Sequence, residues 1–95
     1  MLRHVVLFKM KPEHMDCIPE LIRDLKALKG PVEGLLEMEA GTDIVGGSRS
    51  YDFALIATFP DRAALDAYQV HPLHVAVANR IGEVRESVIA CDFLL

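Results

Sequence analysis

The chain has 95 residues, of which 52% are apolar and 25% charged, so it is long enough for one small globular domain and too apolar for a disordered segment. Its 14 acidic and 10 basic residues give a net charge of −4, which counts against DNA or RNA as a partner. No apolar run approaches the ~20 residues of a membrane span, and the opening "MLRHVVLFKM" is too short for a signal peptide. We therefore expect a cytoplasmic protein with no membrane partner.

The two cysteines, Cys17 and Cys91, lie far apart in the sequence and show no CxxC spacing. In a reducing compartment this pattern predicts two free thiols. A nucleophilic cysteine paired with a histidine is the alternative, but no neighbouring residue supports it.

The first half of the chain predicts a strand, a helix and a second strand. "LRHVVLFK" (2–9) is typical of a strand. Asp16 is the expected N-cap of the helix that follows, with Pro19 in its first turn. Apolar residues at helical spacing form one stripe of that helix, which Gly30 ends: Ile18, Leu21, Ile22, Leu25 and Leu28. "LLEMEAGT" (35–42) alternates as a half-exposed strand does.

The second half predicts a strand, two short helices and a final strand. "YDFALIATF" (51–59) is a strand, and Asp61 caps a helix over 62–70. Pro72 disfavours helical geometry at the preceding residue, so that helix should end there and a new one should begin with the proline in its first position. "SVIACDFLL" (87–95) is the last strand.

The order β-α-β-β-α-β over a single domain, 1–95, predicts an α+β fold of the ferredoxin-like type: a four-stranded antiparallel sheet with helices on one face. Both faces of the sheet are apolar. We expect one face to carry the alternate residues of 53–59 together with Ile89, Cys91 and Phe93, and the other to carry Ala54 and Ile56 with the remaining residues of the last strand.

Helices can cover only one of these faces, whereas an exposed antiparallel face normally carries polar residues. The simplest cover for the other face is a second copy of the chain. The sequence therefore predicts a homodimer in which two sheets enclose a barrel-like interior.

Two stretches, "HVVLFK" and "RSYDFALIATFPDRAALDAYQVHPLHV", together with the element order, resemble the stress-responsive dimeric α/β-barrel (Dabb) family. The likeness covers essentially the whole chain, and "YQVHPLH" is its most specific part. It implies a ferredoxin-like fold and a homodimeric α+β barrel. The family includes stress-induced plant proteins and a plant polyketide cyclase that works by acid/base chemistry without a cofactor.

Carried over residue by residue, the cyclase-type site of that family falls on His4, Tyr68 and His74, which are the candidate catalytic residues. A further histidine of that site is replaced here by Phe53, which puts cyclase chemistry in doubt. A histidine titrates near neutrality and a tyrosine hydroxyl can donate a proton, as acid/base chemistry requires. If the face that His4 shares with Val6 lines the barrel interior, His4 would join the site.

Each candidate also has a structural interpretation. His74 could be bonded to a carbonyl and inert, Tyr68 could be an ordinary buried helix residue, and His71 could cap the helix that Pro72 begins. Otherwise His71 would contact a ligand, as would Arg49 and Tyr51 beside the third strand. A metal site is not expected, because the two neighbouring histidines lack i, i+4 spacing and a third ligand. No nucleotide-binding glycine motif is present.

Two functional hypotheses follow. The first is a stress-response barrel protein that binds a small apolar molecule. The alternative is a cofactor-independent acid/base enzyme, a cyclase or isomerase, acting on an apolar carbonyl compound.

Overall fold

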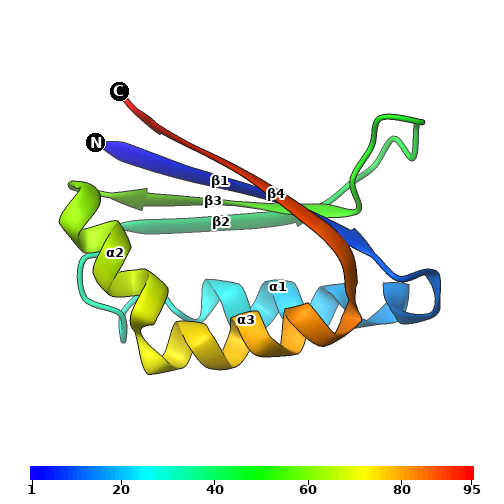
Figure 1. Ribbon diagram of the computed structural model, residues 1–95, viewed down its shortest axis with the longest axis horizontal. Helices are drawn as coiled ribbons and strands as arrows, with labels where there is room; N and C mark the ends of the chain where they lie inside the picture. Colours follow the sequence, from blue (N-terminus) through cyan, green and yellow to red (C-terminus); the bar gives the residue numbers. More distant parts are fainter.

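The computed structural model describes residues 1–95 as one antiparallel sheet with all its helices on one side (Figure 1). The sheet order is β2-β3-β1-β4, so the predicted ferredoxin-like α+β fold is confirmed. In chain order the elements are β1 (Leu2–Met10), the 3-10 helix η1 (Pro12–Cys17), α1 (Ile18–Lys26), β2 (Glu37–Thr42), β3 (Phe53–Phe59), α2 (Arg62–Val70), α3 (Pro72–Val84) and β4 (Arg85–Leu94). None of these helices has the length and apolar character needed to cross a membrane.

The helix starts follow the local sequence closely, with one exception. Asp61 caps α2 by accepting a hydrogen bond from the Ala64 N–H at 2.9 Å, as expected. The predicted cap at Asp16 is wrong: η1 runs directly into α1, and Cys17 is the N-cap residue with no side-chain hydrogen bond. Because the preceding turn already holds the backbone in a helical path, no side chain is needed to start α1.

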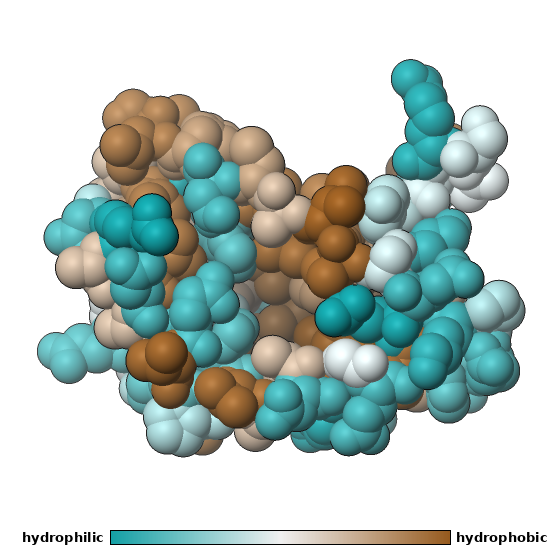
Figure 2. Space-filling model, viewed as in Figure 1, coloured by the Kyte–Doolittle hydropathy of each residue, from teal (hydrophilic) through white to brown (hydrophobic).

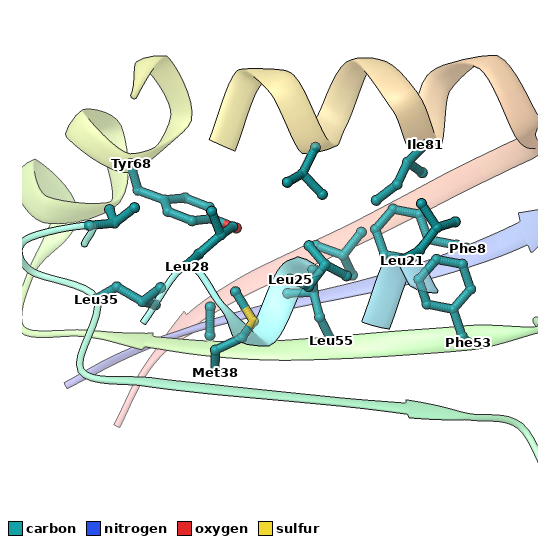
Figure 3. Close-up of a cluster of buried hydrophobic side chains, with 14 of the residues drawn as sticks. Phe8, Leu21, Leu25, Leu28, Leu35, Met38, Phe53, Leu55, Tyr68 and Ile81 are labelled. Atoms are coloured by element: carbon teal, nitrogen blue, oxygen red, sulfur yellow. The ribbon is translucent and has the colours of Figure 1, made fainter. Parts of the chain in front are cut away.

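The core lies between the sheet and the helices. Every second residue of β1 is buried, beginning with Leu2, because successive strand side chains point to opposite faces. The apolar stripe of α1 meets this row, and Leu25 is among its most completely buried side chains. Figure 3 shows Tyr68 projecting from α2 into the same cluster, with Phe8 and Phe53 stacked at the other end at a centroid distance of 4.5 Å.

The strand register corrects the expected division of residues between the two faces. Val5 of β1 has Ile56 and Cys91 as its Cα partners, so these three residues share one face. The expectation that Cys91 would share a face with 53, 55, 57 and 59 is therefore wrong, and so is that for Ile89 and Phe93. The last strand is apolar on both sides, so its own alternation does not reveal which side faces the helices.

The face opposite the helices is apolar and uncovered, as predicted. Its rows across β3, β1 and β4 include Ile56, Leu7, Ile89 and Phe93, and Ile89 remains 49% exposed. We call this side of the sheet the open face. Figure 2 shows hydrophobic surface at the upper left and near the centre of the view, while the helical side below is mostly hydrophilic.

The β2–β3 loop stands up on the same side as the open face (Figure 1). The Asp43 carboxylate accepts hydrogen bonds from the N–H groups of Val45 and Gly46, at 3.2 and 2.7 Å, which fixes the loop tip. Ile44 is nevertheless 95% exposed. The loop thus presents apolar side chains from an ordered turn.

Candidate functional site

The junction of α2 and α3 is built around Pro72. His71 has extended backbone geometry, as expected before a proline, and its Nδ1 accepts a hydrogen bond from the Leu73 N–H at 3.1 Å. This bond satisfies one of the free N–H groups at the start of α3. The structure therefore shows the helix-capping role that the sequence suggested for His71.

The sharp turn at Pro72 brings Tyr68, in the last turn of α2, against His74, in the first turn of α3. Their ring centroids are 4.2 Å apart at an interplanar angle of 42°. Tyr68 also contacts Phe59 of β3, with centroids 5.1 Å apart, and faces His4 edge-on at 6.2 Å. Tyr68 and His74, which are close in the sequence, thus meet His4 of the distant first strand in one cluster.

His4 reaches this cluster from β1 and is held by a carboxylate on the adjacent strand. Its Cα partner on β4 is Asp92, and its Nδ1 is hydrogen-bonded to the Asp92 carboxylate. The His4 side chain is buried, whereas that of Asp92 is 41% exposed. In the sequence Asp92 only interrupts an apolar strand. Its pairing with His4 could not be predicted, because the register between the two strands is not determined locally.

The cluster lines a cavity of about 270 Å³ between the sheet and the helices. The expectation that His4 might face the space between two sheets is wrong, because His4 lies on the helix-covered face. Figure 2 shows a recess with hydrophobic atoms at its floor near the middle of the view, where the sheet above meets the helices below. The lining residues are His4, Val6, Phe8, Leu25, Leu55, Tyr68, Gln69, His74, Ala78, Ile81, Arg85, Val88 and Ala90.

The hydroxyl of Tyr68 is buried in this cavity wall and has no hydrogen-bond partner in the chain. Burial raises the pKa of the Tyr68 hydroxyl above its ordinary value, because the phenolate would lose its hydration. Tyr68 therefore remains a neutral hydrogen-bond donor at physiological pH.

One ring nitrogen of His74 forms a hydrogen bond within the chain, and the other forms none. Its Nδ1 lies 3.3 Å from the carbonyl oxygen of Gln69, and because a carbonyl only accepts, Nδ1 carries the proton and donates. Burial lowers the pKa of His74, the Gln69 carbonyl opposes this effect, and the charges of His4 and His71 lower it further. At neutral pH the Nε2 atom therefore has a free lone pair.

The other residues predicted for the site lie elsewhere. Arg49 and Tyr51 line a separate depression of about 540 Å³ beside the β2–β3 loop, together with open-face residues such as Leu7. His71 is not among the lining residues of the cavity. Phe53 is in the core, stacked on Phe8, and it is Phe8 that borders the cavity.

Arg85 and Gln69 line the cavity but were not singled out in the sequence. Arg85 could have been noticed as a charged residue that directly follows the helix carrying His74, Ala78 and Ile81. Nowhere does the structure gather three or more histidine, cysteine, aspartate or glutamate side chains in a metal-binding group. Both cysteines are free thiols, as predicted.

The fold and the cavity together define an α+β domain with one sheet face left open and a small, largely apolar pocket beneath its helices. The sequence pattern of the stress responsive A/B barrel domain matches residues 2–95, and the chain belongs to this family.

Two relatives by sequence cover nearly all of the chain. An uncharacterized protein of Streptomyces coelicolor is 34% identical over 93 residues, which are 95% of this chain and 96% of that protein. A stress-response A/B barrel domain-containing protein of Arabidopsis thaliana is 26% identical, over 96% of this chain. The chain spans only 45% of the length of the plant protein.

Similar solved structures include two dimeric proteins of unknown function. One, from Thermobifida fusca, is 28% identical with a TM-score of 0.87, over 99% of this chain and 90% of that chain. The other, from Bacteroides fragilis, is 24% identical with a TM-score of 0.90, over 99% of this chain and 95% of that chain. A hydroxynitrile lyase from Passiflora edulis has a TM-score of 0.86 at 19% identity, over 99% of this chain and 93% of that chain, a likeness of fold alone.

Proposed function

We propose that the protein binds a small apolar carbonyl compound in the cavity between the sheet and the helices. The observation that carries the proposal is the buried Tyr68 hydroxyl, which has no partner in the chain. Leaving such a group unsatisfied costs about 1–3 kcal/mol, and a carbonyl oxygen of a ligand would satisfy it. The remaining wall is mostly apolar, with a few polar groups that converge near Tyr68, as is usual for small-molecule sites.

We propose that the chain acts as a homodimer whose two open faces pack against each other to form a barrel. Dimeric relatives of the same fold support this assembly. The Nε atom of Arg3, on the open face, is buried and has no hydrogen-bond partner, so an acceptor from a second copy would satisfy it. Glu39 is an exposed carboxylate on the same face, in register with Ile56, and is a suitable acceptor. A standard interface buries roughly 800 Å² per partner, an area that a four-stranded face can supply.

The second candidate function is acid/base catalysis on the same class of compound. It is favoured by the meeting of His4, Tyr68 and His74 on one cavity. The Tyr68 hydroxyl would donate to the carbonyl oxygen while Nε2 of His74 removes a proton from the adjacent carbon, leaving an enolate hydrogen-bonded to Tyr68. If a carbon–carbon double bond is conjugated with the enolate, returning the proton to its far carbon gives an isomerisation. Attack of the enolate on a second carbonyl of the same molecule, with the His74 proton passing to the new alkoxide, gives a cyclisation. Neither step needs a cofactor.

Calorimetric titration with a panel of apolar ketones tests the binding function. The wild-type protein should bind members of the panel, and Tyr68→Phe should weaken binding at least tenfold, because one buried hydrogen bond is lost. Failure of every ketone to bind, or equal binding by Tyr68→Phe, would contradict the proposal.

Deuterium exchange separates binding from catalysis. In deuterated water an enolising enzyme incorporates deuterium next to the carbonyl of a bound ketone, which proton NMR follows directly. The wild-type protein should accelerate this exchange and His74→Gln should not. Binding without exchange would leave the first function standing and remove the second.

A further inference from the structure

The residues that line the cavity extend along α3 and into the start of β4, with polar residues at both ends. His74, Ala78 and Ile81 line it from one face of α3, and Arg85, which follows the last residue of α3 and begins β4, lines it as well. At about 1.5 Å of rise per residue, the Cα atoms of His74 and Arg85 are roughly 16 Å apart. On the sheet side, Asp92, which is paired with His4, and Arg85 lie near opposite ends of β4, so Arg85 is likewise far from the histidine cluster.

Between these ends the wall is apolar. Val6 and Phe8 of β1 line the cavity here, as do their Cα partners on β4, Ala90 and Val88 respectively. Ile81 contributes from α3. A hydrocarbon chain fits this middle section, while polar atoms of a ligand would find partners only at the two ends.

Arg85 is the cationic end, and it has no counter-ion in the chain. Arg62 pairs with Asp66 at 2.9 Å and Arg80 with Asp24 at 2.8 Å, whereas Arg85 forms no ion pair. Arg85 is half-buried, and none of the 13 residues that line the cavity is an aspartate or glutamate. A guanidinium keeps its charge at all physiological pH values, so a cation in these surroundings favours a bound anion.

We propose that Arg85 binds the carboxylate of the ligand, so that this cavity prefers medium-chain keto acids to neutral ketones. The carboxylate would lie at Arg85, the hydrocarbon chain along Ile81 and Val88, and the carbonyl at Tyr68 and His74. This inference rests on the proposed binding function and specifies its ligand class. The guanidinium fork matches a carboxylate with two parallel hydrogen bonds, which gives the acid its advantage.

The test compares 9-oxodecanoate with its methyl ester by calorimetric titration of the full chain at neutral pH. The two probes share the ketone and the chain and differ in the charge at one end. The wild-type protein should bind the acid at least tenfold more tightly than the ester, as a charge-assisted bidentate contact supplies. Arg85→Gln should remove this preference by weakening the acid alone.

Two further variants make the comparison specific. Arg80→Gln removes the same charge from α3, one turn before Arg85 and outside the cavity, and it should leave the preference for the acid unchanged. Arg85→Lys keeps the charge without the fork and should retain part of the preference. Thermal melts by circular dichroism confirm that each variant is folded before titration.

The outcomes separate the two proposals. If the wild-type protein binds acid and ester equally, or if Arg85→Gln keeps the preference, the role of Arg85 is refuted while ketone binding stands. If neither probe binds and no simple ketone binds, the proposed function fails and the keto-acid inference fails with it.

Discussion

The two faces of the sheet consist of the same apolar residue types but have different surroundings. The helix-covered face is closed over by α1, α2 and α3, and a cavity beneath them is lined by His4, Tyr68 and His74. The open face has no cover in the chain, and its residues, such as Ile89 and Phe93, remain partly exposed. Composition alone would not distinguish these faces, whereas the polar atoms on each do.

The two buried polar atoms without partners fall one on each face. The Tyr68 hydroxyl belongs to the covered face and the Arg3 Nε atom to the open one. We infer a small molecule for the first and a second copy of the chain for the second. If the faces have these separate roles, a substitution on one should leave the property of the other intact, and the predictions below test that separation.

The largest effect is expected from a charge placed on the open face. Ile89→Glu should dissociate the dimer, because an unpaired charge buried in an interface costs about 3–5 kcal/mol and a two-fold interface contains the substitution twice. Since Ile89 is half-exposed within one copy, the monomer itself should tolerate the change. Size-exclusion chromatography with light scattering measures the mass in solution.

Val70→Glu is the control for this experiment, because Val70 is 75% exposed at the end of α2 and lies on neither face. It should remain dimeric. A wild-type protein that is a stable, folded monomer at micromolar concentration would contradict the dimer outright.

The next largest effect is expected at Tyr68, where loss of the hydroxyl should raise stability and lower ligand affinity. Tyr68→Phe removes a buried hydroxyl that has no partner, so without ligand the free energy of unfolding should rise by about 1–3 kcal/mol. For a domain of this size that corresponds to several degrees in Tm. Ligand affinity should fall in the same variant. Thermal denaturation and titration of one preparation measure both.

Tyr51→Phe is the matched control, since it makes the same chemical change beside the open face. It should alter neither property. A loss of affinity in Tyr51→Phe would instead place the ligand in the depression that Tyr51 and Arg49 line.

A smaller effect is the difference between substitutions of His71 and His74. His71→Ala should lower the free energy of unfolding by about 1 kcal/mol, because the bond to the Leu73 N–H caps α3. It should leave ligand binding unchanged. His74→Ala should keep the dimer intact and abolish proton exchange on a bound ketone, because the free Nε2 is lost. A His74 variant with clearly lower stability and unchanged activity would make His74 a structural residue.

Much of the fold could be predicted from the sequence because each element carries its own local signal. Asp61 and Pro72 mark the starts of α2 and α3, and the alternation in β1 marks a strand. The meeting of Tyr68 with His74 is also local, since one turn separates them.

The features that could not be predicted depend on pairing between distant strands. The contact of His4 with Asp92 follows from a register that two apolar faces leave undetermined. The position of the cavity beneath the helices, rather than between two sheets, depends on the same register. Which β4 residues lie on the helix side is determined only by the pairing of β4 with β1.

The smallest expected effect is the pH dependence that His74 gives to stability. Its pKa in the folded protein is lowered from the ordinary value of 6.5, mainly by burial. As the pH falls below 6.5, the unfolded chain therefore takes up a proton at this residue before the folded protein does, and the folded state loses stability. Above 6.5 both states are neutral and the residue contributes no pH dependence. His74→Gln lacks this contribution, so its stability relative to the wild type should improve as the pH is lowered from 7 to 5.

Chemical denaturation at a series of pH values measures the difference. His14→Gln, a variant of a histidine in η1 outside the cavity, provides the comparison for removing a histidine of any kind. A stability difference between wild type and His74→Gln that stays constant from pH 7 to pH 5 would show that His74 is not desolvated. It would then titrate as an exposed histidine does, and a neutral Nε2 facing the cavity could not be assumed. The pH series thus tests, without any ligand, the state of the residue on which the proposed chemistry depends.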